Sequence, residues 1–184
     1  SSSLSPAEFV DQVKRTSIAV IGQSANLAPA DKMLYALRDV TATVDSIPLI
    51  SSSIMSKKLA AGTKSIVLDV KCGRGSFMKT PKEARLLAET MVKIGNAHQR
   101  RTAAVITNMD IPLGHAIGNS LEVIEAVETL KGNGPEDLTD ICIALATDML
   151  TLTGEHGDRA ACEAKVRDAI ASRKALDTLA RMVK

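Results

Sequence analysis

The sequence predicts an α/β fold with three or more parallel strands and flanking helices. Three short runs rich in Ala, Ile, Leu and Val recur along the chain, at residues 17–22, 65–70 and 102–107. Nearly continuous apolar runs of this length are typical of strands covered on both faces of a sheet. Helical stretches separate the three runs, and strands that alternate with helices favour parallel pairing.

A capping box opens two of the predicted helices, at residues 5–8 (SPAE) and 80–83 (TPKE). Each combines a hydroxyl N-cap, Pro at the first helical position and a Glu that reaches back to the cap. In chain order, helices are expected over residues 6–14, 29–40, 47–61, 81–97, 121–130 and 135–152, and from residue 157 onward as two pieces broken near residue 172.

The composition limits the classes of partner. A chain of 184 residues can form one domain with a sizeable core, or a domain plus a smaller piece. Aromatic residues make up only 2% of the chain and Trp is absent, so the core must consist of aliphatic side chains and some of the 7 Met. The net charge is +2, and no basic run is interleaved with aromatic residues. We therefore expect no nucleic-acid partner.

The cysteines predict a cytoplasmic location. Cys72, Cys142 and Cys162 are an odd number, widely spaced and without a CxxC pair, so neither a disulfide framework nor a structural zinc site is expected. No apolar run approaches the roughly 20 residues of a membrane-spanning helix. The first residues also lack the basic and apolar regions of a secretory signal, so no membrane partner is expected.

Residues 35–58 carry the clearest candidate site. Tyr35 and Arg38 lie three residues apart on one predicted helix, and Ser53 and Lys57 lie four apart on the next, so each pair shares a helix face. Folded together, these side chains could bind one small polar ligand. The alternative is two solvated polar faces, which are common on helices.

Two other stretches give weaker signals. The loop KCGRGSF after the second strand resembles a phosphate-binding loop but matches neither GxxxxGK[ST] nor GxGxxG, and its glycines could serve the backbone alone. Residues 113–125 join a Gly-containing turn to a helix with Glu122 and Glu125, a donor set that suits a hard cation but also fits solvated carboxylates. The three His form no cluster with metal-ligand spacing.

Three phrases together carry a family resemblance: AVIGQSANLAPADKMLYALRDVTATVDSIPLISSSIMSKKLA, VLDVKCGRGSFMKT and NMDIPLGHAIGNSLEVIEAVETLKGNGPEDL. Over residues 18–150 the chain closely resembles the pyrimidine-nucleoside and thymidine phosphorylases, most of all the bacterial pyrimidine-nucleoside branch. Members of this family are homodimers with a small all-α domain and a larger α/β domain. The resemblance implies that residues 1–26 and 61–184 belong to the α/β domain and residues 27–60 supply helices of the small domain.

The resemblance also implies a reaction, a ligand set and partners. The reaction is reversible phosphorolysis, in which a pyrimidine nucleoside and phosphate give the free base and a pentose 1-phosphate. Arg38, Ser53 and Lys57 are implied to hold the base, with Tyr35 beside it. A potassium ion is implied at the backbone carbonyls of Leu113 and Ala116 and the carboxylate of Glu125, with its further ligands on a segment that is not among these residues. Dimerisation is implied through the helical domain.

The chain lacks two parts of the family's sequence. The family's KHSTGG segment, with the catalytic His and much of the phosphate site, is not among these residues, and neither is the C-terminal domain. We therefore expect an internal fragment that is inactive alone and contains no general acid. Two alternatives stay open: a phosphoribosyltransferase of the related fold, and a non-catalytic helical interaction fragment.

Overall fold

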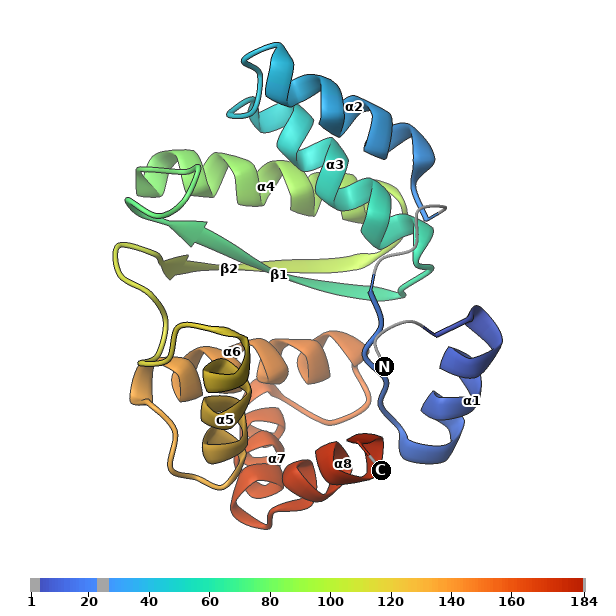
Figure 1. Cartoon of the computed structure of the whole chain (residues 1–184), viewed down its shortest axis with the longest axis vertical. Helices are drawn as coiled ribbons and strands as arrows, with labels where there is room; N and C mark the ends of the chain where they lie inside the picture. Colours follow the sequence, from blue (N-terminus) through green and yellow to red (C-terminus); the bar gives the residue numbers. More distant parts are fainter. Residues whose placement is uncertain (1–3, 23–26, 184) are drawn as a thin grey trace.

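The computed structural model describes residues 4–22 and 27–183, which form an α/β fold of eight helices around one parallel sheet (Figure 1). The elements are, in order, α1 Pro6–Thr16, α2 Pro29–Val40, α3 Ile47–Ala60, β1 Ser65–Cys72, α4 Pro81–Ala97, β2 Arg101–Asn108, α5 Asn119–Leu130, α6 Glu136–Thr153, α7 Arg159–Ala171 and α8 Lys174–Val183. The predicted fold class and every predicted helix are confirmed, most to within two residues at each end.

The sheet is the middle layer of the molecule. β1 and β2 pair in parallel, with Ser65 opposite Arg101 and Cys72 opposite Asn108. Helix α4 packs on one face and connects the two strands, while α6 packs on the other face (Figure 1). The fold is therefore a β–α–β unit covered on both sides, as continuous apolar strands require.

The main apolar core lies between β1, α3 and α4. Along β1 the most buried side chains alternate, and these point toward the same core as residues of both helices. The almost fully buried members are Ile50, Met55, Ile66, Leu68, Val70, Met78, Ala84, Leu87, Ala88 and Met91. Because Ile50 and Met55 belong to α3, this core fixes α3 to the sheet layer, and α2 then packs along α3 (Figure 1).

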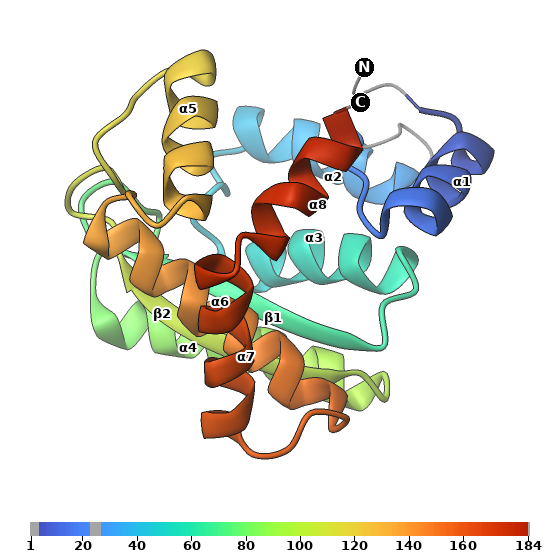
Figure 2. The same cartoon turned by 90° about the horizontal axis from the view of Figure 1, so that it is seen from below.

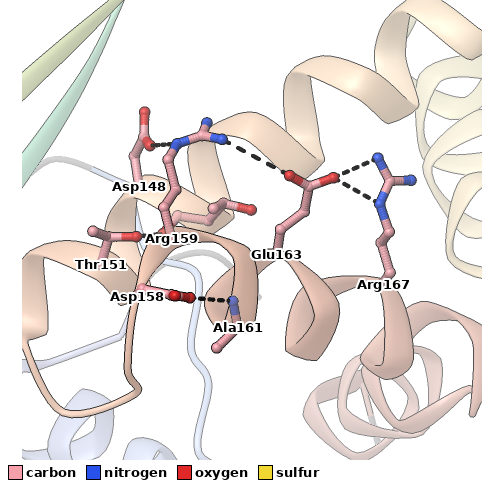
Figure 3. Close-up of polar contacts among 8 residues, drawn as sticks. Asp148, Thr151, Asp158, Arg159, Ala161, Glu163 and Arg167 are labelled. Carbon is pink, nitrogen blue, oxygen red and sulfur yellow. Dashed lines mark hydrogen bonds and ion pairs between the residues drawn. The ribbon is translucent and has the colours of Figure 1, made fainter.

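The two ends of the described chain lie side by side. Helix α1 contacts α8 (Figure 2). Gln12 Nε2 donates a hydrogen bond to the carbonyl of Met182 at 3.3 Å. Helices α6 and α7 are joined by one partly exposed ion pair, in which Arg159 Nε lies 3.2 Å from Asp148 Oδ1 (Figure 3). Within α7, Glu163 lies between Arg159 and Arg167 and pairs with both. Exposed pairs of this kind contribute little to stability individually.

The expectation of three or more strands is wrong for the described residues, which contain two. The run at residues 17–22 forms no strand: Ser17 ends α1 in a left-handed conformation (φ 65°), and Val20 is 61% exposed. A strand is held by the backbone of a neighbour, and in the described part of the chain the sheet consists of β1 and β2. An apolar, β-branched composition indicates a side chain that suits a sheet surface, but it does not supply the partner.

The two predicted capping boxes are confirmed. Glu8 N donates to Ser5 Oγ, and Ser5 N donates to the Glu8 carboxylate; Thr80 and Glu83 repeat this arrangement at the start of α4. Hydrogen bonds from the hydroxyl and backbone N–H of Thr80 hold the pKa of Glu83 below its ordinary value. This carboxylate therefore stabilises α4 above its ordinary pKa, and the contribution is lost as the pH falls through the lowered pKa.

The division of the chain into parts at residues 26 and 60 stays a prediction.

Candidate base-binding site

Helices α2 and α3 bring the four predicted side chains together. The guanidinium carbon of Arg38 lies 5.3 Å from the centre of the Tyr35 ring, and Lys57 Nζ lies 5.7 Å from the same centre. Lys57 Nζ also donates to Ser53 Oγ at 3.0 Å. Two cations from different helices thus face one aromatic ring, within the range of cation–π attraction.

Arg38 is the most constrained member of the group. It is only 6% exposed, and its Nη2 donates to the backbone carbonyl of Val44 in the connection between the helices. That connection folds back at once, because Thr43 N donates to the Arg38 carbonyl at 3.4 Å and Ser46 N to the Thr43 carbonyl at 3.2 Å. Arg38 Nε is buried and has no hydrogen-bond partner among the described residues. A buried donor without an acceptor is costly, so a ligand that reached this nitrogen and accepted from it would remove that cost.

Sequence reasoning missed Asp31, which lies at the centre of the site. Its carboxylate is 2.8 Å from Lys57 Nζ, and its side chain is 9% exposed. Residue spacing could have predicted it, because Asp31, Tyr35 and Arg38 follow positions i, i+4 and i+7 and so share one face of α2.

The surroundings keep Asp31 ionised. Burial raises the pKa of Asp31, but hydrogen bonds from Lys57 and Ser53 lower it. The charges of Lys57 and Arg38 add to this, so the pKa of Asp31 lies below its ordinary value. A lowered carboxyl pKa means that the pairing stabilises the fold above about pH 4 and that this stabilisation is lost as the pH falls further.

The charges of this site suit a polar, nearly neutral ligand. Arg38 and Lys57 supply two positive charges and Asp31 one negative charge, which leaves a net positive site. The half-exposed Tyr35 ring offers a flat surface, and Ser53 offers a hydroxyl that can both donate and accept. A planar heterocycle with an imide edge, on which negative charge develops during reaction, fits these groups.

The glycines of KCGRGSF are explained by packing. A Cβ on Gly73, whose φ is +136°, would lie 2.7 Å from Asp110 N, and a Cβ on Gly75 would lie 2.8 Å from the Met109 carbonyl. Arg74 N donates to Asp110 Oδ1 at 2.8 Å, so the loop is bonded to the segment after β2. The structure therefore favours the backbone interpretation of this loop over a phosphate site.

The residues of the predicted cation site are also neighbours. Leu113, Ala116 and Glu125 line one cavity. Glu125 Oε1 accepts hydrogen bonds from the backbone N–H groups of His115 at 2.8 Å and Ala116 at 3.0 Å. A Cβ on Gly114, where φ is +70°, would collide with the carboxylate, so the loop curls closely around Glu125. These contacts are made by N–H groups, which bind the carboxylate but are not cation ligands, so the predicted cation site stays a prediction.

Other site classes find little support in the described part of the chain. Residues 4–22 and 27–183 contain no group of three His, Cys, Asp or Glu side chains arranged to bind a metal. Cys72, Cys142 and Cys162 are all free thiols. None of the helices described is long and apolar enough to cross a membrane.

Comparison with known proteins decides the family. The family described as "Glycosyl transferase family, a/b domain" matches residues 3–176 of the chain. The chain belongs to this family. Among glycosyl transferase family members, the Bacillus subtilis pyrimidine-nucleoside phosphorylase is 56% identical over 174 residues, which cover 95% of this chain and 40% of that protein.

Two further relatives carry the same name. The pyrimidine-nucleoside phosphorylase of Geobacillus stearothermophilus is 62% identical over 145 residues, or 79% of this chain and 34% of that protein. The Staphylococcus aureus protein is 53% identical over 178 residues, or 97% of this chain and 41% of that protein. The chain thus spans about two fifths of the length of these glycosyl transferase relatives.

Proposed function

We propose that the protein catalyses the reversible phosphorolysis of pyrimidine nucleosides and that α2 and α3 hold the pyrimidine base. The observation that carries this proposal is the meeting of Arg38 and Lys57 at one aromatic ring, with a buried Arg38 nitrogen that lacks an acceptor. The names of the relatives support the same reaction.

The proposed chemistry follows from where charge develops. As the glycosidic bond breaks, the bonding electrons leave with the base, and its ring becomes negative. Fixed cations at Arg38 and Lys57 stabilise that charge more than the neutral substrate, which lowers the barrier. Ser53 can contact the imide edge as donor and acceptor, and the Tyr35 ring can lie against the base.

The two alternatives are less well supported. A phosphoribosyltransferase would need acidic residues for magnesium, and no acidic cluster of that kind occurs in the residues that the structure describes. A purely structural fragment gives no reason for Arg38 and Lys57 to meet at the Tyr35 ring.

The assay for this function is phosphate-dependent release of uracil from uridine. We expect the full-length enzyme to release uracil only when phosphate is present and to form no product from a phosphoribosyl donor and a free base. We expect the 184-residue chain alone to release none, because the family's phosphate-binding segment is not among its residues. Release of uracil without phosphate would contradict the reaction, and release by the 184-residue chain would contradict the assignment of the phosphate site.

Potassium binding is a further part of the proposal. The Leu113 and Ala116 carbonyls and the Glu125 carboxylate would hold the ion, which would neutralise the carboxylate and stiffen the loop around it. Potassium chloride should raise the melting temperature of the full-length enzyme above that in tetramethylammonium chloride of equal ionic strength. The difference should vanish in Glu125→Gln; an equal response of wild type and variant would rule the site out.

We also propose that the protein forms a homodimer through its helical part, which includes α2, and that it is located in the cytoplasm. Helix α2 exposes apolar side chains that would be covered in a dimer. They are Met33, Leu34, Leu37 and Val40. Native mass spectrometry should show a dimer that Leu37→Glu converts to a monomer; a wild-type monomer at micromolar concentration would contradict this part.

A further inference from the structure

The contact between Asp31 and Lys57 joins the two helices that form the proposed site. Asp31 lies in the first turn of α2 and Lys57 in the last turn of α3, and their charged atoms are 2.8 Å apart. The Asp31 side chain is 9% exposed and that of Lys57 28%. A pair at this depth is less screened than a surface pair, so it restrains both side chains.

The donors of Lys57 show what this restraint does. A lysine ammonium carries three N–H donors on a flexible four-carbon chain and has no preferred direction of its own. Here Asp31 Oδ2 accepts at 2.8 Å and Ser53 Oγ lies at 3.0 Å, so two of the three directions are fixed. The third donor remains for a ligand, and Nζ itself lies 5.7 Å from the centre of the Tyr35 ring.

The charge of Asp31 also allows the two cations to share the site. Arg38 and Lys57 both lie within 6 Å of one ring centre and repel each other. Asp31 lies on the same face of α2 as Tyr35 and Arg38 and contacts Lys57 directly. Its carboxylate therefore offsets part of the repulsion.

We infer that Asp31 is a positioning residue, which holds the ammonium of Lys57 in the direction needed to stabilise the departing base. This inference rests on the proposed function. Because Asp31 acts through Lys57, its removal should matter only while Lys57 is present. A residue that merely stabilises the fold would not show this dependence.

The test is a double-mutant cycle on the full-length enzyme, with Asp31→Asn, Lys57→Met and the combined variant. Asn keeps the shape of Asp but removes the charge. In the wild-type background, we expect Asp31→Asn to lower kcat for uridine at least about tenfold, since a charge-assisted hydrogen bond is lost. The KM for uridine should change less than kcat, because Lys57 acts mainly on charge that appears in the transition state. In the Lys57→Met background, the same substitution should change kcat less than about twofold.

Asp148→Asn is the matched control, because it removes a carboxylate from an ion pair with Arg159 between α6 and α7 (Figure 3). We expect it to leave kcat unchanged. Asp31→Glu is the second variant at the site, since it keeps the charge on a longer arm; it should retain more activity than Asp31→Asn. The melting temperature of each variant identifies losses caused by unfolding.

Equal losses from Asp31→Asn in both backgrounds would overturn the inference, and so would a loss of less than about threefold in a folded variant. An Asp31→Glu enzyme no more active than Asp31→Asn would also overturn it. Those results would leave the proposed function intact, because the wild-type enzyme would still release uracil. A wild-type enzyme without phosphorolysis would instead refute the proposed function, and the inference with it.

Discussion

Replacing Arg38 by Ala is expected to lower kcat/KM for uridine phosphorolysis by about 10- to 150-fold. The range corresponds to the roughly 1.5–3 kcal/mol of one hydrogen bond made by a charged group. Arg38 has the buried, unpartnered Nε described above, and a departing base can become its acceptor. The loss should be larger in kcat than in KM, because the negative charge develops only as the glycosidic bond breaks. Steady-state kinetics of the full-length enzyme with uridine and saturating phosphate measure it.

The structural role of Arg38 has to be separated from its role in binding. Its Nη2 also donates to the Val44 carbonyl, so Arg38→Ala leaves that carbonyl without its partner and should lower the melting temperature. Arg38→Lys keeps a positive charge but loses the planar set of donors, and it should still lose about tenfold. Arg159→Ala removes an exposed arginine and serves as the control. If the folded Arg38→Ala enzyme keeps kcat/KM within about threefold of wild type, the base-binding assignment fails.

The local signals in the sequence predicted most of the helices. Capping residues and Pro at a first helical position act on the backbone within one turn, so they need no knowledge of the rest of the chain. The structure places the start of α4 at Pro81 and that of α2 at Pro29, where the sequence predicts them. The run at residues 17–22 failed as a strand because strand formation depends on a neighbour that no local pattern specifies.

For the candidate site as well, local spacing predicted contacts within a helix but not contacts between helices. Pairs within one helix could be predicted from spacing, and the structure does place Tyr35 beside Arg38 and Ser53 beside Lys57. The pairing of Asp31 with Lys57 joins residues 26 positions apart on two helices. Spacing within either helix therefore cannot predict this contact. The packing of α3 on the sheet, which sets where Lys57 lies, depends on apolar contacts with β1 and α4.

A second large effect is expected at the contact between α4 and β2, where Gly95→Ala should lower the free energy of unfolding by about 1–2 kcal/mol. Two effects oppose each other. Ala favours a helix over Gly by at most about 1 kcal/mol, and less near the helix end. Against this, a Cβ on Gly95 would collide with the Thr102 hydroxyl and lie 2.9 Å from Thr102 Cβ. Overpacking of this kind costs about 1–3 kcal/mol, so the collision outweighs the gain in helix propensity.

The cost of the collision between Gly95 and Thr102 can be measured by changing Thr102 as well. Asn96→Ala, at an exposed neighbour on α4, measures the helix-propensity gain without the collision and should be neutral or slightly stabilising. In a Thr102→Ala background, the hydroxyl that meets the new methyl group is gone, so Gly95→Ala should cost less than it does beside Thr102. Urea unfolding of the wild type, the two single variants and the double variant measures the coupling. An equal cost in both backgrounds would mean that the helix backbone, rather than the approach of α4 to β2, requires glycine at this position. The close approach matters beyond stability, because α4 also packs against α3 and so supports the helix that carries Ser53 and Lys57.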